Sequence, residues 1–216
     1  MRPGTVRRPI PSHCVTVGFQ GRIDGMADNE ILLRHRQALE MFTARVRAVK
    51  EEQWDTPTPC TEWSVSDLVN HLTTEQLWVP RLVRDGATIA EVGDAYDGDQ
   101  LGNDPVGTWE RAAAAAIEAF NERNALRRIV HLSYGDSSAA AYCAQMTTDA
   151  AVHAWDLSRA IGADERMPDG LADAALREVQ PYAHALSKSG LFAAAIEPPS
   201  GADQQTKLLC LLGRHP

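Results

Sequence analysis

Hydrophobic residues recur every three or four positions along most of the chain, the spacing that places apolar side chains on one face of an α-helix. The pattern predicts helices over residues 29–50, 66–84, 105–122, 138–161 and 169–188, with a short last helix over 206–212. Residues 126–134 alternate instead and carry β-branched side chains, which predicts a short strand or an extended crossing. The sequence therefore predicts an all-α fold: a bundle of four main helices with a strand-like crossing and extra C-terminal helices.

Prolines, glycines and capping residues predict where these helices begin and end. Two prolines forbid a helix over residues 56–60, which we expect to be an extended loop. Ser64 or Ser66 can cap the helix that follows. The Gly-Asp pair at residues 135–136 is expected to turn the chain, and Gly162 is expected to end the fourth helix.

Residues 1–25 differ in composition from the rest of the chain. They hold four arginines against one acidic residue, and three prolines among the first eleven positions. The apolar stretch from Val15 to Phe19 is shorter than the core of about 7–15 residues in a signal peptide. A clean helical pattern begins at Met26, so we expect Met26 to be the natural start and residues 1–25 to be a disordered or mis-called extension. Residues 26–216 form the predicted bundle domain.

Composition limits the classes of partner. The 216 residues carry 21 Lys and Arg against 29 Asp and Glu, a formal net charge of −8. A nucleic-acid-binding surface needs an excess of basic residues, so we expect no nucleic-acid partner. No apolar run approaches the roughly 20 residues that cross a bilayer, so we expect no membrane span. The cysteines show no metal-binding or disulfide spacing, and we interpret them as incidental thiols of a cytoplasmic protein. They are Cys14, Cys60, Cys143 and Cys210.

Two polar residues, Asp149 and His153, interrupt the apolar stripe of the predicted helix 138–161. The stripe reads Tyr142, Met146, Asp149, Ala150, His153, Leu157 and Ala160. An ionised carboxylate in a dry core is unfavourable by several kcal/mol unless it is paired or coordinated. Residues four apart on a helix lie one above the other, so Asp149 and His153 can bind one ion.

His71 offers a third ligand from the second predicted helix, three residues after Leu68 and one before Leu72. Two imidazoles and a carboxylate on facing helices favour Zn²⁺, with Ni²⁺ or Fe²⁺ as alternatives, and leave coordination positions open. The pattern also fits a core histidine and a structural Asp–His ion pair without metal, because the sequence does not show whether the two helices touch. His35, on the apolar stripe of the first helix, is expected to be a core or rim histidine and not a ligand.

Neighbouring residues carry weaker signals. Asp156 either pairs with Arg159, three residues later, or orients a ligand histidine. Trp63 and Trp155 are expected to pack between helices, with stacking on a substrate as the alternative.

Three stretches of the chain resemble a known family. Residues 58–65 (TPCTEWSV) with 67–72 (DLVNHL), and residues 152–162 (VHAWDLSRAIG), are similar to the signatures of the mycothiol-dependent maleylpyruvate isomerase N-terminal domain, in the DinB-like superfamily. The ending, from Pro198 to Arg214, resembles an actinobacterial subfamily of metal-binding proteins in that group. The resemblance covers roughly residue 26 to the C-terminus.

The resemblance implies a four-helix bundle whose divalent metal is held by a histidine of the second helix and by an acidic residue and a histidine four apart on a later helix. On this chain those positions are His71, Asp149 and His153. The family commonly has Glu where this chain has Asp149. Because Asp is one methylene shorter, we expect its oxygen to reach the ion through a helix shift or through water. The two-domain isomerase has a separate C-terminal catalytic domain that this sequence does not show, so we do not expect maleylpyruvate isomerisation itself.

The resemblance also implies chemistry with a low-molecular-weight thiol such as mycothiol. A thiolate is the nucleophilic form, and a divalent metal with an open position lowers the pKa of a bound thiol. We therefore expect a metal-dependent thiol S-transferase or isomerase that acts on a small electrophile, with the thiol as co-substrate and no protein nucleophile. The alternatives are a non-catalytic protein that binds a metal or small molecule, and a scaffold without the site. Homodimerisation through a bundle face stays open.

Overall fold

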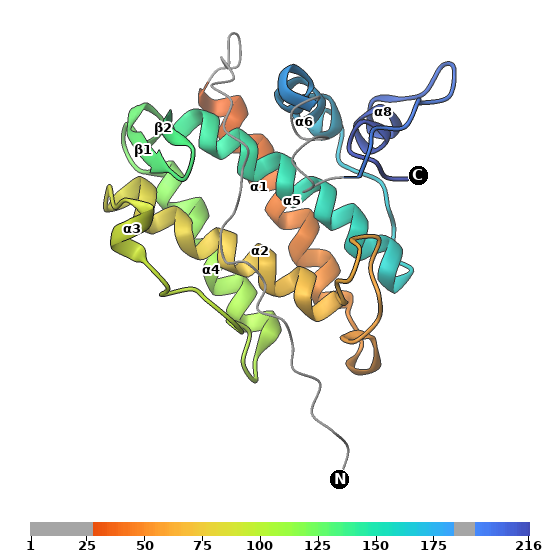
Figure 1. Cartoon of the computed structure of the whole chain (residues 1–216), viewed down its shortest axis with the longest axis horizontal. Helices are drawn as coiled ribbons and strands as arrows, with labels where there is room; N and C mark the ends of the chain where they lie inside the picture. The colour runs from red at the N-terminus through yellow and green to blue at the C-terminus, as the bar shows by residue number, and fades with distance from the viewer. Residues whose placement is uncertain (1–27, 184–192) are drawn as a thin grey trace.

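Four long helices lie side by side in the computed structural model, which describes residues 28–183 and 193–216 (Figure 1). They are α1 (Asp28–Ala48), α2 (Val65–Val79), α4 (Pro105–Asn121) and α5 (Ala139–Ile161). The largest contacts join α1 to α5 and α2 to α4, and smaller contacts of α1 with α4 and of α2 with α5 close the ring. The predicted all-α bundle is confirmed. The expectation for residues 1–25 lies outside the described residues.

The ends of these helices follow from their capping residues. Ser64, not Ser66, caps α2: its side chain accepts from the backbone N–H of Asp67, and the Asp67 carboxylate accepts from Ser64 in return. Gly162 ends α5 in the left-handed conformation, as predicted. The second helical run reaches Arg84, as predicted, but its last five residues differ in type: Pro80 has no N–H to donate, so α2 ends at Val79 and the chain widens into a π-helical turn over Pro80–Arg84.

The strand-like crossing is one half of a small hairpin. Strand β1 (Ile129–Leu132) pairs antiparallel with β2 (Gly135–Ser138), and Leu132 faces Gly135 across the turn. The expectation that residues 135–136 form the turn is therefore wrong by two positions: the turn is at residues 133–134, and Gly135 begins the second strand. The error arose because β2 is short and polar, so no alternation marks it. A single-turn helix, α3 (Ile89–Val92), lies nearby, and Thr88 bridges to β1.

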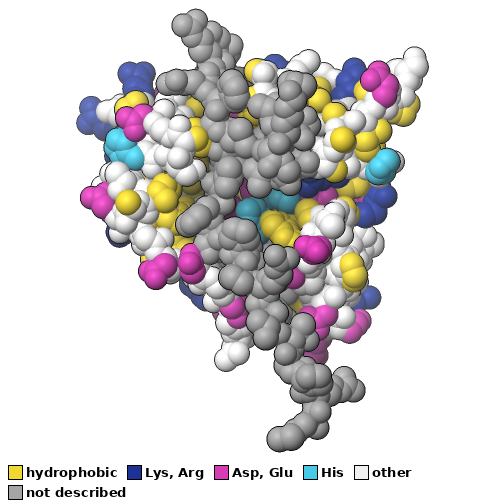
Figure 2. Space-filling model, in the orientation of Figure 1, with side chains coloured by type: hydrophobic (Ala, Val, Ile, Leu, Met, Phe, Trp, Pro, Cys, Tyr) yellow, Lys and Arg dark blue, Asp and Glu magenta, His cyan; other side chains and the backbone are white. Residues whose placement is uncertain are grey.

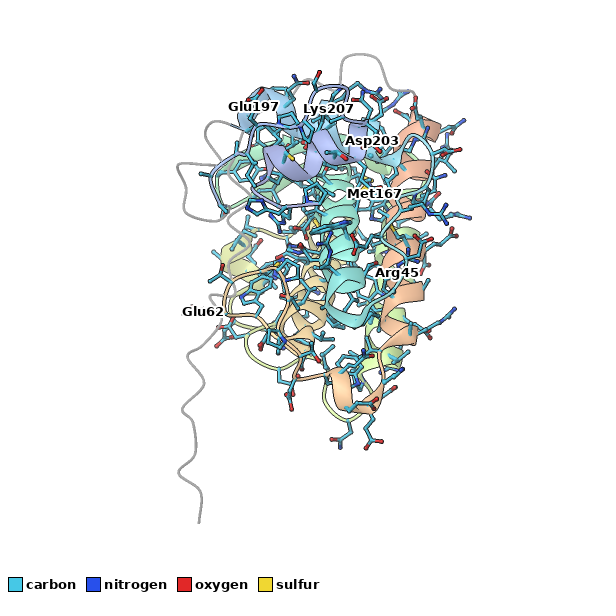
Figure 3. The ribbon with its side chains drawn as sticks, turned by 90° about the vertical axis from the view of Figure 1, so that its right-hand side faces the viewer. Arg45, Glu62, Met167, Glu197, Asp203 and Lys207 are labelled. Carbon is cyan, nitrogen blue, oxygen red and sulfur yellow. The ribbon has the colours of Figure 1, made fainter. Side chains whose placement is uncertain are left out.

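Additional helices cover α5 on its side away from α4. Helix α6 (Leu171–Val179) packs on α5 and continues as a 3₁₀ turn over Gln180–Tyr182, and α8 (Gln204–Leu211) packs on α6. The rest of the helix predicted over 169–188 lies outside the described residues. In Figure 3, Glu62 marks the 54–64 loop on one side of α5 and Arg45 marks α1 on the other. No helix in the described ranges is both long and apolar enough to span a bilayer.

The buried stripe of α5 shares its apolar residues with the stripe read in the sequence but is centred on the side of Ala150 and Ala154. Met146, Ala150, Ala154 and Leu157 are fully buried and pack in the core of the bundle. Val152, on the opposite side of the helix, packs instead against residues of α6 and α8. The two polar residues of the predicted stripe therefore lie on the edge of α5 between these two apolar contacts.

Candidate metal centre

Three side chains from α2 and α5 converge at the edge of the bundle. His71 projects from α2 toward Asp149 and His153, which lie one helical turn apart on α5. The Asp149 carboxylate lies between the two rings: Oδ2 is 3.7 Å from Nε2 of His71, and Oδ1 is 3.4 Å from Nε2 of His153. One ligand atom from each of the three residues lies within 4.8 Å of the others. The structure therefore brings together the residues that the sequence singled out.

These separations suit a shared cation. A tetrahedral Zn²⁺ with ligand bonds of 2.0–2.1 Å holds its ligand atoms about 3.3 Å apart, close to the two distances measured at Asp149. Oδ2 of Asp149 is buried and has no hydrogen-bond partner among the described residues, although its side chain keeps 26% of its surface exposed. A buried carboxylate oxygen without a partner is unfavourable, and a metal ion at this point would satisfy it. The shorter Asp side chain therefore still reaches both imidazoles.

The charge of Asp149 is held by its two neighbours. Burial by itself raises the pKa of this carboxyl, but the imidazoles of His153 and His71 outweigh burial and keep the pKa below its ordinary value. The side chain therefore presents an anionic oxygen pair at neutral pH, which is the form that binds a cation.

A second layer of residues orients His153. Nδ1 of its ring is 3.0 Å from Oδ2 of Asp156, a carboxylate that is completely buried. Because an ionised carboxylate can only accept, Nδ1 carries a proton, and Nε2, which faces Asp149, is the nitrogen that would bind a metal ion in exchange for its own proton. The Arg214 guanidinium donates to both oxygens of Asp156, at 2.8 and 3.3 Å. Of the two readings of Asp156 given by the sequence, the contacts support orientation of a ligand histidine, because Arg159 pairs with Glu165 instead.

Cys60 lies against this second layer. Its Sγ is 3.2 Å from Oδ2 of Asp156 and 3.6 Å from Nδ1 of His153. Cys60, His153 and Asp156 therefore also have ligand atoms within reach of one cation. However, the Arg214 guanidinium occupies the Asp156 carboxylate and lies 3.7 Å from Sγ, so a positive group already fills that position. We interpret these residues as support for the first set, and the interpretation of Cys60 as an incidental thiol needs correction.

Trp63 forms an aromatic wall beside the imidazoles. Its ring centroid is 4.8 Å from that of His71 and 5.9 Å from that of His153. The His71 side chain is 19% exposed and the His153 side chain 8% exposed, so the site reaches the surface at His71 and Asp149. Figure 2 shows histidine side chains beside hydrophobic side chains near the middle of this face. A polar ligand site with an apolar wall is therefore present where solvent can enter.

Glu75 is a further residue that sequence analysis missed. Its side chain is almost completely buried, and Oε1 is 4.0 Å from Nδ1 of His71. Each imidazole of the site therefore has a carboxylate on its Nδ1 side. Glu75 follows His71 by one helical turn, so the (i, i+4) spacing could have identified it.

Comparison with known proteins places the chain in a family. The sequence model of one protein family, described as "Mycothiol maleylpyruvate isomerase N-terminal domain", matches residues 35–158. This range is more than half of the chain and includes His71, Asp149 and His153. Two proteins of Mycobacterium tuberculosis, from strains CDC 1551 / Oshkosh and ATCC 25618 / H37Rv, are each 30% identical over 141 residues, 65% of this chain and 72% of the relative, and both are described as uncharacterized. No solved structure gives a significant match. The chain therefore belongs to the mycothiol maleylpyruvate isomerase N-terminal domain family.

Proposed function

We propose that the protein holds one divalent metal ion through His71, Asp149 and His153 and transfers a low-molecular-weight thiol of the mycothiol type to a small electrophile, or isomerises such an electrophile. The observation that carries the proposal is the Asp149 carboxylate, which lies between two imidazole nitrogens and whose buried Oδ2 lacks a hydrogen-bond partner among the described residues. The family supplies the link to a thiol. Zn²⁺ is the preferred ion, because two imidazoles and one carboxylate suit it, and Ni²⁺ and Fe²⁺ are alternatives.

Each residue of the proposed site has a separate role. A bound divalent ion with an open position would lower the pKa of a coordinated thiol and so supply the nucleophilic thiolate at neutral pH. His71, Asp149 and His153 would bind the ion, and Asp156, by accepting from Nδ1 of His153, would leave Nε2 of that ring to the ion. Trp63 presents an apolar face next to both imidazoles, which favours binding of the carbon part of an electrophile and excludes water. The proposal requires no nucleophile from the protein.

The proposal is tested with metal-free protein reloaded with Zn²⁺ and assayed with mycothiol and a panel of electrophiles such as monobromobimane and 1-chloro-2,4-dinitrobenzene. We expect saturable turnover that a chelator abolishes and that His71→Ala loses. The matched control is His35→Leu, which changes a histidine of α1 that is buried in the core and should retain turnover. Stoichiometric metal binding without turnover for any pair would refute the transferase and favour the non-catalytic binding protein. Protein that binds no divalent ion would refute both.

A further inference from the structure

The C-terminal segment delivers one charged side chain to the metal centre. Helix α8 ends at Leu211, and the chain then folds back in a Schellman motif, with the N–H of Gly213 bonded to the carbonyl of Cys210 and the N–H of Arg214 to that of Leu209. Gly213 has a φ of +75°, and a Cβ there would come within 2.7 Å of Ala193. The residue after the glycine of such a motif usually makes an apolar contact. Here it is Arg214, whose side chain is 10% exposed and directed at α5.

Arg214 contacts Asp156 in the geometry that fixes a carboxylate most firmly. Nη2 and Nε donate to the two different oxygens of Asp156, and Nη1 donates to the carbonyl oxygen of Leu212 at 2.9 Å. A bidentate arginine–carboxylate pair restricts the rotation of the carboxylate as well as balancing its charge. Because Asp156 is completely buried, it has no solvent to replace that partner.

The same carboxylate oxygen binds the ligand histidine. Oδ2 of Asp156 accepts from Nη2 of Arg214 and faces Nδ1 of His153 at 3.0 Å, with the Cys60 thiol as a third neighbour. If the carboxylate rotates, the imidazole loses the hydrogen bond that fixes its tautomer and its plane. Partners of this kind, one step behind a metal ligand, typically contribute 10- to 100-fold to metal affinity.

We propose that Arg214 is a positioning residue for the metal ligand His153, acting through Asp156. The inference rests on the proposed metal site and deepens it, because Arg214 lies outside the matched range 35–158. The C-terminal segment thereby becomes part of the metal centre. Its guanidinium also keeps a second cation away from Cys60 and Asp156, which directs the ion to the Nε2 side of His153.

The test is a Co²⁺ titration of metal-free protein, followed by visible absorption in competition with a chelator. Wild type is compared with Arg214→Met, Arg214→Lys, Asp156→Asn and the double variant Asp156→Asn/Arg214→Met. Arg159→Met is the matched control, since Arg159 stacks on Trp155 and pairs with Glu165 away from the site. Circular dichroism and the unfolding midpoint of each metal-free protein establish that the measuring temperature leaves it folded.

We expect Arg214→Met to weaken Co²⁺ binding about 10- to 100-fold and to change the visible band, because the His153 ring is no longer held. Arg214→Lys should recover part of the affinity, because it restores the charge without the bidentate fork. In the Asp156→Asn background, Arg214→Met should weaken binding less than about threefold, since its effect passes through Asp156. The control should bind as wild type does.

Two results would overturn the positioning role. One is folded Arg214→Met that binds Co²⁺ within about threefold of wild type with an unchanged spectrum; if that variant does not fold, Arg214→Lys with unchanged affinity decides in the same sense. The other is an equal loss from Arg214→Met in the presence and absence of the Asp156 carboxylate. Metal binding without thiol transfer contradicts only the proposed transferase, because the Arg214 result is measured as affinity. Wild type that binds no Co²⁺ overturns both.

Discussion

His35 and His153 are both buried histidines of the same bundle, in opposite surroundings. The His35 ring, on α1, is completely buried, packs edge-on against Phe120 with centroids 5.0 Å apart, and has no hydrogen-bond partner at either nitrogen among the described residues. Burial lowers its pKa to about 3, so it is neutral in the folded protein. His153 has carboxylates within 3.4 Å of each ring nitrogen, supplied by Asp149 and Asp156.

The pKa values of these two histidines shift in opposite directions because of the carboxylates near His153, and not because of a difference in burial. Burial by itself also lowers the pKa of His153, but the acidic groups of Cys60, Asp149 and Asp156 outweigh it and raise that pKa well above the ordinary value. A ring held in this way has a fixed orientation and faces anionic oxygens, whereas the His35 ring faces hydrocarbon. A histidine on an apolar stripe therefore becomes a candidate ligand only when carboxylates lie at its nitrogens.

The largest effect should come from removing the ligand ring itself. His153→Ala should lower Zn²⁺ affinity more than about 100-fold, because a ligand and the link to Asp156 are lost together. His35→Leu should leave affinity within about twofold. Metal content after dialysis against a weak chelator measures both. Equal metal content in wild type and His153→Ala would contradict the claim that His153, unlike His35, is a metal ligand.

Asp149 gives the next largest effect and tests whether its oxygens bind the ion. Asp149→Ala should weaken Zn²⁺ binding by about 100-fold, since it removes the carboxylate that lies between the two Nε2 atoms. Asp149→Glu should stay within about tenfold of wild type, because the longer side chain keeps the ligand type. Competition titration distinguishes these outcomes, and an unaffected Asp149→Ala would show that this carboxylate only pairs with the histidines.

The buried His35 should make the free energy of unfolding depend on pH. The pKa of His35 is about 3 in the folded protein, against about 6.5 in an unfolded chain. Between pH 6.5 and pH 3 this histidine is therefore protonated in the unfolded chain and neutral in the folded protein. Stability attributable to His35 is therefore present above pH 6.5 and falls by about 1.4 kcal/mol per pH unit down to pH 3.

His35→Leu should flatten that slope and match or exceed wild-type stability at pH 7, because it removes two buried nitrogens without partners. Urea unfolding of metal-free protein at pH 7, 6, 5 and 4 provides the measurement. An identical slope in wild type and His35→Leu would mean that His35 is charged or solvated in the folded protein.

Cys143 should show the smallest effect on the site. Its side chain is completely buried on α5, where burial raises the pKa of the thiol far above its usual range. Cys143→Ala should lower the unfolding free energy by about 1 kcal/mol through lost packing and leave Zn²⁺ affinity within about twofold. A marked change in Zn²⁺ affinity would contradict the structure, in which the Cys143 thiol is buried and takes no part in the site.

Local patterns explain how much the sequence could predict. The helices of the bundle and the pair Asp149 and His153 follow from spacings of three and four along one helix. Residue type narrowed the N-cap of α2 to Ser64 or Ser66, and the structure shows Ser64. The contact with His71 joins two helices, so only the structure places that ring beside Asp149.

Of the supporting residues, Cys60 and Arg214 could not be assigned to the site from spacing, because they come from a loop and from a distant segment. Arg214 is 58 residues from Asp156, and Cys60 is 93 residues from His153. Neither has a periodic neighbour, and a single cysteine or arginine in a loop carries no spacing signal. The polar strand β2 was missed for a related reason, since its pairing with β1 lies in the fold and not in its composition.

The central claim is that a metal ion binds on the Nε2 side of His153, and zinc K-edge X-ray absorption of the Zn²⁺-loaded protein tests it most directly. The account predicts a coordination shell of nitrogen and oxygen atoms at about 2.0–2.1 Å with the multiple scattering of two imidazoles. A sulfur atom at about 2.3 Å, in protein without added thiol, would place the ion against Cys60 and contradict the account.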